Sequence, residues 1–155
     1  MLKYMFLAAV VFCYIIKDNK VLLIKRNNPP ARNQYTVIGG KKEKGENIVN
    51  ACIREVYEET NLMVSDLKLV GIINNYIENY DRETLTFYFI ANSFCGELKS
   101  SQEGDLEWCD IEASYEKEGI SEFYVKISPL VFDNKELFVG DVLIDKNGLI
   151  KSISF

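Results

Sequence analysis

The 155-residue chain has a net charge of −5, 48% hydrophobic residues and no histidine. An acidic chain disfavours binding along a nucleic-acid backbone, and the lack of histidine excludes Ser-His-Asp catalysis, Cys-His catalysis and histidine-ligated zinc. We therefore expect a single globular domain over residues 1–155, whose acid–base chemistry relies on carboxylates, lysine, tyrosine or cysteine.

The N-terminal apolar run, Met5–Ile16, is too short to span a bilayer and has no small-x-small cleavage site at its end. A polar turn separates it from a second apolar run, Val21–Ile24, and two such runs predict a buried β-hairpin. Four scattered cysteines without a C-x-x-C pair are typical of reduced thiols, so we expect a cytoplasmic protein with no membrane association. Two disulfides in a secreted domain are the alternative.

A basic loop with two prolines, residues 25–34, precedes a predicted strand at Tyr35–Ile38. It is either an exposed linker or a segment in which Lys25, Arg26 and Arg32 bind a polyanionic substrate. Both interpretations stay open at this stage.

The stretch Gly40–Leu62 is a glycine-rich loop followed by a predicted helix. In the helix, Glu55, Glu58 and Glu59 are spaced i, i+3 and i+4 and lie together along one edge of the apolar face. Three neighbouring carboxylates repel one another unless a hard divalent cation, Mg²⁺ or Mn²⁺, lies among their oxygens. The alternative is an acidic helix face exposed to solvent.

Flanking residues favour the metal site over the solvated face. Gly39 and Gly40 allow the backbone to approach a ligand closely. Glu46 adds a fourth carboxylate, Arg54 can hold a carboxylate in a fixed orientation, and Lys41 is a candidate phosphate contact.

This stretch resembles the signature of the Nudix hydrolases, G-x5-E-x7-R-E-U-x-E-E-x-G-U, where U is a bulky aliphatic residue. The matching positions are Gly40, Glu46, Arg54, Glu55, Val56, Glu58, Glu59 and Leu62. The late glycine of the signature is Asn61 here. Asparagine is the commonest other residue in the left-handed conformation that closes a helix, so we expect the helix to end there.

The resemblance implies an α/β protein with an α/β/α sandwich around a mixed β-sheet. It implies a pyrophosphohydrolase that uses Mg²⁺, or Mn²⁺, to cleave nucleoside diphosphate derivatives. The implied roles are metal binding by Glu55, Glu58, Glu59 and the Gly39 carbonyl, cofactor contacts by Gly40 and Lys41, and orientation of the carboxylates by Glu46 and Arg54.

The rest of the chain alternates strand and helix patterns. We expect strands at Leu67–Asn74 and Leu85–Ala91 with a polar loop at 75–83, one or two short helices within 111–131, and a terminal hairpin of 139–144 and 149–153 around Lys146-Asn147-Gly148.

The segment from Phe94 to Trp108 resembles a subgroup of the family, the MutT-like 8-oxo-dGTP diphosphatases. That resemblance implies that Glu103 faces the helix as an extra metal ligand or general base, with Glu107 as the fallback; a surface acid is the alternative. It also implies an oxidised purine triphosphate, such as 8-oxo-dGTP, as the substrate and its monophosphate as the product.

Substrate-binding candidates are polar or aromatic, and each alone is more often an ordinary loop or core residue. They are Arg26, Arg32, Asn33, Tyr35, Asn74, Asn75, Tyr76, Tyr80 and Phe123. Tyr80 stands where dinucleoside polyphosphate hydrolases carry a tyrosine, which makes that activity the first alternative. A catalytically silent nucleotide-binding sensor is the second, and the lack of proline between Pro30 and Pro129 disfavours an ADP-ribose enzyme. We expect a small nucleotide as the partner, no nucleic-acid polymer, and a monomer or homodimer.

Overall fold

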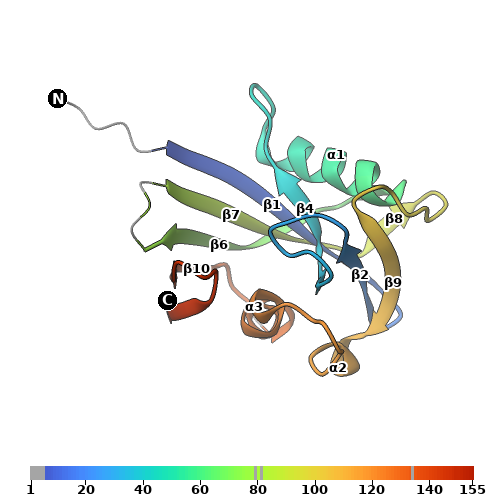
Figure 1. Cartoon of the computed structure of the whole chain (residues 1–155). Helices are drawn as coiled ribbons and strands as arrows, with labels where there is room; N and C mark the ends of the chain where they lie inside the picture. Colours follow the sequence, from blue (N-terminus) through green and yellow to red (C-terminus); the bar gives the residue numbers. More distant parts are fainter. Residues whose placement is uncertain (1–5, 79, 81, 134) are drawn as a thin grey trace.

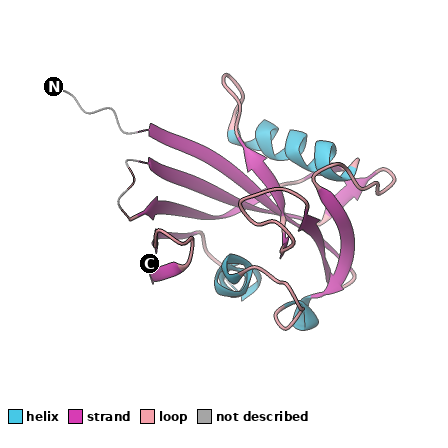
Figure 2. Cartoon of the chain, in the orientation of Figure 1, coloured by secondary structure: helices cyan, strands magenta, loops and turns pink. Residues whose placement is uncertain are grey.

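The computed structural model describes residues 6–78, 80, 82–133 and 135–155. A mixed β-sheet lies between α1 (Ile48–Thr60) on one face and α3 (Glu122–Asp133) on the other (Figures 1 and 2). The expected α/β/α sandwich is confirmed. The remaining elements are β1 (Phe6–Lys17), β2 (Lys20–Arg26), β3 (Tyr35–Thr36), β4 (Ile38–Lys41), β5 (Met63–Ser65), β6 (Lys68–Ile77), β7 (Arg82–Ala91), β8 (Ser93–Cys95), β9 (Gly104–Asp110), α2 (Ile111–Ser114), β10 (Phe138–Ile144) and β11 (Ile150–Ser154).

The main sheet has the strand order β11-β10-β6-β7-β1-β2-β3, with β4 also paired to β1 and β9 to β2. The pairs β1–β7 and β6–β10 are parallel and the others are antiparallel, while β5 and β8 form a separate two-stranded sheet. Because β1 pairs with β2, β4 and β7, it brings the glycine-containing strand β4 to the middle of the sheet.

The hairpin predicted at the N-terminus is confirmed as β1 and β2. Its two turn residues, Asp18 and Asn19, have φ angles of 50° and 60°. Positive φ at both central residues matches the twist of the flanking strands in a two-residue turn. Aspartate and asparagine tolerate that conformation better than most residues.

Alternation along β1 divides the interior into two cores, one on each face of the sheet. Val11 and Cys13 pack with Cys52 and Val56 of α1. Tyr14 faces the other way and packs in the core that contains Tyr124, Ile127 and Val131 of α3. The functional residues of α1 are therefore fixed by the first of these cores.

Asparagines cap both ends of α1, and the C-terminal end forms as the sequence predicts. The side chain of Asn47 accepts a hydrogen bond from the Asn50 N–H at 2.8 Å, a cap that contributes about 1 kcal/mol. Asn61 closes the helix with φ 63° and ψ 13°, the left-handed conformation expected for the position of the family's glycine.

Two predictions for the strands need correction, and one strand was missed. The loop expected at 75–83 is wrong in its bounds, because β6 continues to Ile77 and β7 begins at Arg82. The Asn75 Nδ2 donates to Thr86 Oγ1 across the two strands and ties this polar side chain to the sheet, while its Oδ1 is buried with no partner among the described residues. The strand expected at Tyr35–Ile38 is two strands, β3 beside β2 and β4 beside β1. β9 was not predicted, because its pairing with β2 is a long-range contact.

The later helices and the terminal hairpin match their predictions as α2, α3, β10 and β11. The cysteines are free thiols, with Cys13 and Cys52 buried, Cys109 half-buried and Cys95 exposed. Among the described residues, no helix combines the length and apolar character needed to cross a bilayer.

Candidate active site

Arg54 lies at the centre of the site and joins α1 to the loop before it. Its Nη2 and Nε donate to the two carboxylate oxygens of Glu46 at 2.7 and 3.1 Å. Its Nη1 donates to Glu55 at 2.9 Å and to Glu58 at 3.2 Å, and its Nη2 also donates to the Lys41 carbonyl at 3.0 Å. One guanidinium thus orients three of the predicted carboxylates.

The glycine pair of β4 is required by the close approach of its neighbours. A Cβ on Gly40 would lie 2.5 Å from the carboxylate of Glu55, and a Cβ on Gly39 would lie 2.1 Å from the carbonyl oxygen of Val11. Gly40 therefore provides the space for the Glu55 carboxylate, while Gly39 allows β4 to pair tightly with β1.

Glu59 is the buried carboxylate of the site, with only 3% of its surface exposed. Its Oε2 accepts a hydrogen bond from the Gly39 N–H at 3.2 Å. Burial raises the pKa of Glu59 to about 8, even though the Gly39 hydrogen bond acts in the opposite direction. Burial also raises the pKa of Glu55, against the effect of its hydrogen bond to Arg54. A cation beside these two groups would favour their ionised forms.

Glu46 has the opposite electrostatic environment. Its hydrogen bonds with Arg54, and then its bond from the Glu43 N–H at 2.6 Å, lower its pKa to about 2. The same contact with Glu46 raises the pKa of Arg54 above its already high value. Glu46 therefore stays ionised and holds Arg54 in position.

A second cation, Arg26, faces the buried carboxylate from the end of β2. Its Nη2 lies 3.8 Å from Glu103 Oε2, and its Nε is buried with no hydrogen-bond partner among the described residues. Arg26 lowers the pKa of Glu59 and Glu103 raises it, so both charges act on that group. The structure thus brings two of the predicted residues, Arg26 and Glu103, to the acidic cluster.

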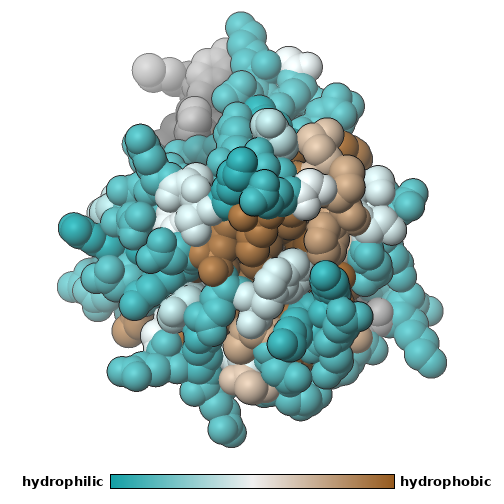
Figure 3. Space-filling view, turned by 90° about the vertical axis from the view of Figure 1, so that its right-hand side faces the viewer, coloured by the Kyte–Doolittle hydropathy of each residue, from teal (hydrophilic) through white to brown (hydrophobic). Residues whose placement is uncertain are grey.

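The segment that resembles the 8-oxo-dGTP diphosphatases packs against the end of α1. Phe94 and Trp108 stack with ring centroids 5.7 Å apart, and the side chain of Asn61 donates to the Glu97 carbonyl at 2.8 Å. Seen from the side where β8 and β9 lie, apolar side chains gather in a central patch within a hydrophilic surround (Figure 3). These contacts fix the start of β9, where Glu103 lies.

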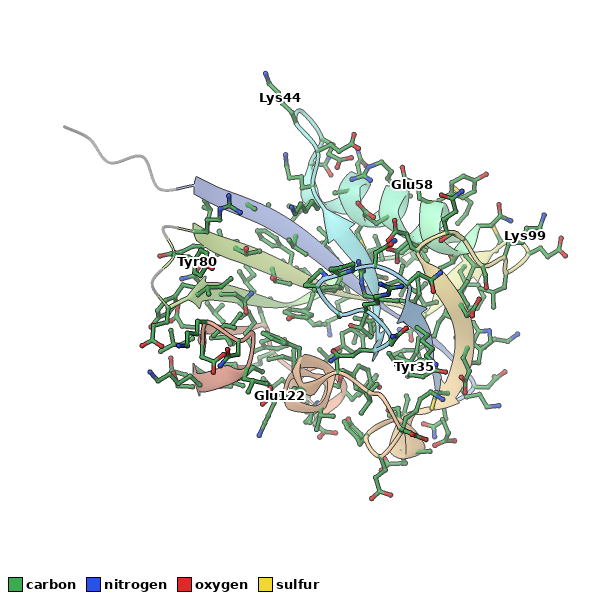
Figure 4. The ribbon with its side chains drawn as sticks, viewed as in Figure 1. Tyr35, Lys44, Glu58, Tyr80, Lys99 and Glu122 are labelled. Carbon is green, nitrogen blue, oxygen red and sulfur yellow. The ribbon has the colours of Figure 1, made fainter. Side chains whose placement is uncertain are left out.

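Tyr35 lies on the side of the sheet away from α1, apart from the acidic cluster. Its ring is 5.6 Å from the Lys25 Nζ and 4.3 Å from the Lys117 Nζ. Lys117 also pairs with Glu107 at 2.8 Å, which places this fallback acid with Tyr35 (Figure 4).

The remaining candidates are dispersed. The exposed Tyr80 lies at the far end of the molecule from Glu58 (Figure 4). Arg32 and Asn33 are exposed in the loop after β2, where the Asn33 N–H donates to the Arg26 carbonyl at 2.7 Å. Phe123 lies in the first turn of α3 and packs against the core on that face of the sheet. Asn74, Asn75 and Tyr76 follow one another on β6.

The donor chemistry of the cluster fits a hard divalent cation. The cluster has an excess of negative charge, because four carboxylates lie near only two arginines; these carboxylates are Glu46, Glu55, Glu58 and Glu59. Carboxylate oxygens are the ligands that Mg²⁺ and Mn²⁺ prefer. Within the described part of the chain, no three side chains already converge on a common metal position. Arg54 binds one oxygen of Glu55 and one oxygen of Glu58, which leaves the second oxygen of each carboxylate for a metal, and the ligand assignment stays a prediction.

Sequence reasoning missed the contributions of the backbone. The Lys41 carbonyl binds Arg54, whereas the prediction concerned its ammonium group, and the N–H groups of Gly39 and Glu43 bind carboxylates. Backbone groups leave no trace in residue type, so no sequence signal identifies them.

Comparison with known proteins agrees with this site. The sequence profile of the NUDIX domain matches residues 6–131, and the chain belongs to the Nudix family. An ADP-ribose pyrophosphatase of Methanocaldococcus jannaschii is 31% identical over 146 residues, which cover 94% of this chain and 78% of that protein. The human 8-oxo-dGDP phosphatase NUDT18 is 32% identical over 101 residues, which cover 61% of this chain and 30% of that protein.

A solved structure supports the same assignment along almost the whole chain. The crystal structure of a MutT protein from Bacillus halodurans has a TM-score of 0.84 and 28% sequence identity, and the match covers 95% of this chain and 96% of that one. The protein is therefore a Nudix pyrophosphohydrolase, a hydrolase of nucleoside diphosphate derivatives from a family that generally uses divalent metal ions.

Proposed function

We propose that this enzyme uses Mg²⁺ to hydrolyse an oxidised purine nucleoside triphosphate, such as 8-oxo-dGTP, to the monophosphate and pyrophosphate. The observation that carries the catalytic part is the buried Glu59, hydrogen-bonded to the Gly39 N–H and facing both Arg26 and Glu103. A carboxylate that is buried beside other carboxylates is destabilised without a cation, and a metal–nucleotide complex supplies one.

Each residue of the cluster has a distinct role in this proposal. Glu55, Glu58, Glu59 and the Gly39 carbonyl hold the metal, while Glu46 and Arg54 fix the orientation of the carboxylates. The metal, when bound, withdraws charge from the phosphate oxygens. Arg26 neutralises a phosphate oxygen.

Glu103 acts as the general base in this proposal. It accepts the proton of the attacking water as a P–O bond of the phosphoanhydride breaks. Its carboxylate has 46% of its surface exposed and only a loose contact with Arg26 at 3.8 Å, so it is open to water. The helix glutamates are the alternative bases.

The oxidised purine is favoured by the name of one similar protein, an 8-oxo-dGDP phosphatase, and by the resemblance of the segment from Phe94 to Trp108 to the MutT-like 8-oxo-dGTP diphosphatases. An ADP-ribose substrate is the second candidate, because the similar ADP-ribose pyrophosphatase covers more of this chain. Dinucleoside polyphosphates and a silent sensor module remain the alternatives, although the full set of box glutamates favours activity.

The test is product release from 8-oxo-dGTP, dGTP, a dinucleoside tetraphosphate and ADP-ribose in Mg²⁺. Wild type is compared with Glu58→Gln, with Glu59→Gln and with the matched control Glu97→Gln, whose side chain is 83% exposed away from the cluster. We expect preference for 8-oxo-dGTP, lost in the first two variants and retained in the control. If another nucleotide is preferred, that nucleotide replaces 8-oxo-dGTP as the proposed substrate. If no nucleotide is hydrolysed, the sensor module becomes the proposed function.

A further inference from the structure

The sheet face that carries the active site continues beyond α1, which packs on β1, β4 and β5. Residues paired across neighbouring strands present their side chains on the same face. The strand register therefore defines rows of side chains that cross this face. The first row consists of Val139, Ile72, Phe87, Val11 and Gly40. The second row, two residues away along the strands, consists of Asp141, Asn74, Leu85 and Ala9. The first row ends at the glycine that contacts Glu55, so the second row begins beside the active site and leads away from it.

This outer part of the face is mainly apolar. Ile72 and Leu85 are half-buried and belong to neither core, while Val139 is 59% and Tyr76 39% exposed. A flat apolar floor with an aromatic ring at its edge suits the face of a purine. Asn74 and Asp141 form a polar pair across it.

The hydrogen bond between these two residues fixes their orientation. The Asn74 Nδ2 donates to the Asp141 Oδ1 at 3.3 Å, and only the amide nitrogen can donate to a carboxylate. The Asn74 Oδ1 is left buried with no partner among the described residues. Leaving such an acceptor unpaired is costly and calls for an explanation. We explain the unpaired oxygen by the role of the Asn74 amide, which holds the Asp141 carboxylate in one orientation on the open face.

We propose that Asp141, positioned by Asn74, binds the base of the substrate and selects a purine with N–H donors at N1 and N2, as in guanine and 8-oxoguanine. The exposed carboxylate only accepts hydrogen bonds. A guanine edge offers it two adjacent N–H donors, whereas adenine presents the N1 acceptor beside its single amino group. Adenine would therefore place an acceptor against the carboxylate.

The distances along the sheet suit this arrangement. Asp141 on β10 lies four strand spacings from β4, which is roughly 19 Å, and the two rows are about 7 Å apart along the strands. An extended nucleotide whose phosphates are held by a metal at Glu55 therefore places its base over Leu85, with its edge toward Asp141. The inference rests on the proposed function and names the base that this site prefers.

The first experiment measures base binding without hydrolysis. Calorimetric titration of the full chain in EDTA compares dGMP, dIMP, which lacks the 2-amino group, and dAMP. In wild type we expect dGMP to bind about tenfold or more tightly than dAMP, with dIMP between them, the size of one good bidentate base contact. Equal affinities for dGMP and dAMP would overturn the proposal.

The second experiment moves the preference by mutation. Asp141→Asn and Asn74→Leu should reduce the dGMP-to-dAMP ratio to within about threefold. The control Asp66→Asn makes the same chemical change at an exposed residue with φ 51°, where asparagine is well accommodated. A ratio that stays at the wild-type value in Asp141→Asn refutes the assignment. The two proposals can fail separately. If the variants lose selective binding of dGMP but the wild type hydrolyses no triphosphate, the proposed function is wrong and the base-binding site is supported.

Discussion

Arg54 and Glu46 meet in a two-pronged ion pair, with Nη2 to Oε1 at 2.7 Å and Nε to Oε2 at 3.1 Å. The pair joins the middle of α1 to the loop that precedes it, eight residues earlier in the chain. The remaining nitrogen, Nη1, is then directed at Glu55 and Glu58. The orientation of the acidic edge therefore depends on a planar guanidinium and not only on a positive charge.

The first prediction follows from that planarity. Arg54→Lys keeps the charge but cannot bind both oxygens of Glu46 while reaching Glu55. Because small misplacements of catalytic groups have large effects on rate, we expect kcat to fall roughly 100-fold. Steady-state kinetics with Mg²⁺ test this, with circular dichroism to confirm folding. A variant with the wild-type kcat would show that charge alone suffices.

The second prediction concerns acid stability. Glu46 has a folded-state pKa of about 2 against an ordinary value of 4.5, so its ionised form stabilises the fold above pH 4.5. This contribution is lost as the pH falls from 4.5 through 2. Glu46→Gln should unfold at a lower temperature than wild type at pH 7, and the gap should close toward pH 2. A gap independent of pH between 2 and 7 would contradict the assigned origin of the shift.

The third prediction concerns Glu59, where the sign is reversed. Its folded-state pKa of about 8 lies above the ordinary value of 4.5, so the folded protein binds an extra proton between these two pH values. The protein therefore loses stability as the pH rises from 4.5 to 8. In EDTA at pH 9, Glu59→Gln should therefore unfold at a temperature several degrees above wild type. Added Mg²⁺ should stabilise wild type more than the variant, because a metal favours the ionised carboxylate. Unfolding curves at pH 5, 7 and 9 test both statements, and a wild type with pH-independent stability in EDTA would refute them.

The fourth prediction separates crowding from backbone strain. Gly40→Ala places a Cβ 2.5 Å from the Glu55 carboxylate, so we expect activity to fall at least tenfold. Gly45→Ala meets no atom within 4 Å but must adopt φ 86°, which costs about 1–2 kcal/mol of stability and leaves activity near wild type. Kinetics and unfolding of both variants check the contrast. Equal losses of activity would mean that the Gly40 contact has no special role.

The fifth prediction tests the general base. Glu103→Gln should lower kcat about 100-fold or more with little change in Mg²⁺ affinity. Glu107→Gln is the matched control four residues further along the chain, in β9, because its carboxylate pairs with Lys117 on the other side of the sheet. If the control loses as much activity as Glu103→Gln, the assignment of the base fails.

Local patterns allowed much of the fold to be predicted. The hairpin of β1 and β2, the C-terminal end of α1 and the terminal hairpin each depend on neighbouring residues, such as Asp18-Asn19 in the first turn. β9 could not be predicted, because its alternating residues become a strand only where β2 offers an edge. The polarity of Asn75 suggested a loop, but its Nδ2 donates to Thr86 inside the sheet.

The same division holds for the site. By itself, the sequence determined that Glu55, Glu58 and Glu59 share one helix edge, because helical spacing is a local property. It did not reveal that Asp141 lies on the same sheet face, since the pairing of β6 with β10 is a contact between distant segments. Only the tertiary structure decided that Glu59 is 3% exposed while the side chain of Glu58 is 55% exposed. The reason is that α1 lies across β4. The Gly39 N–H of β4 binds the Glu59 carboxylate, and β4 pairs tightly with β1, so Glu59 is shielded from water while the adjacent Glu58 is not.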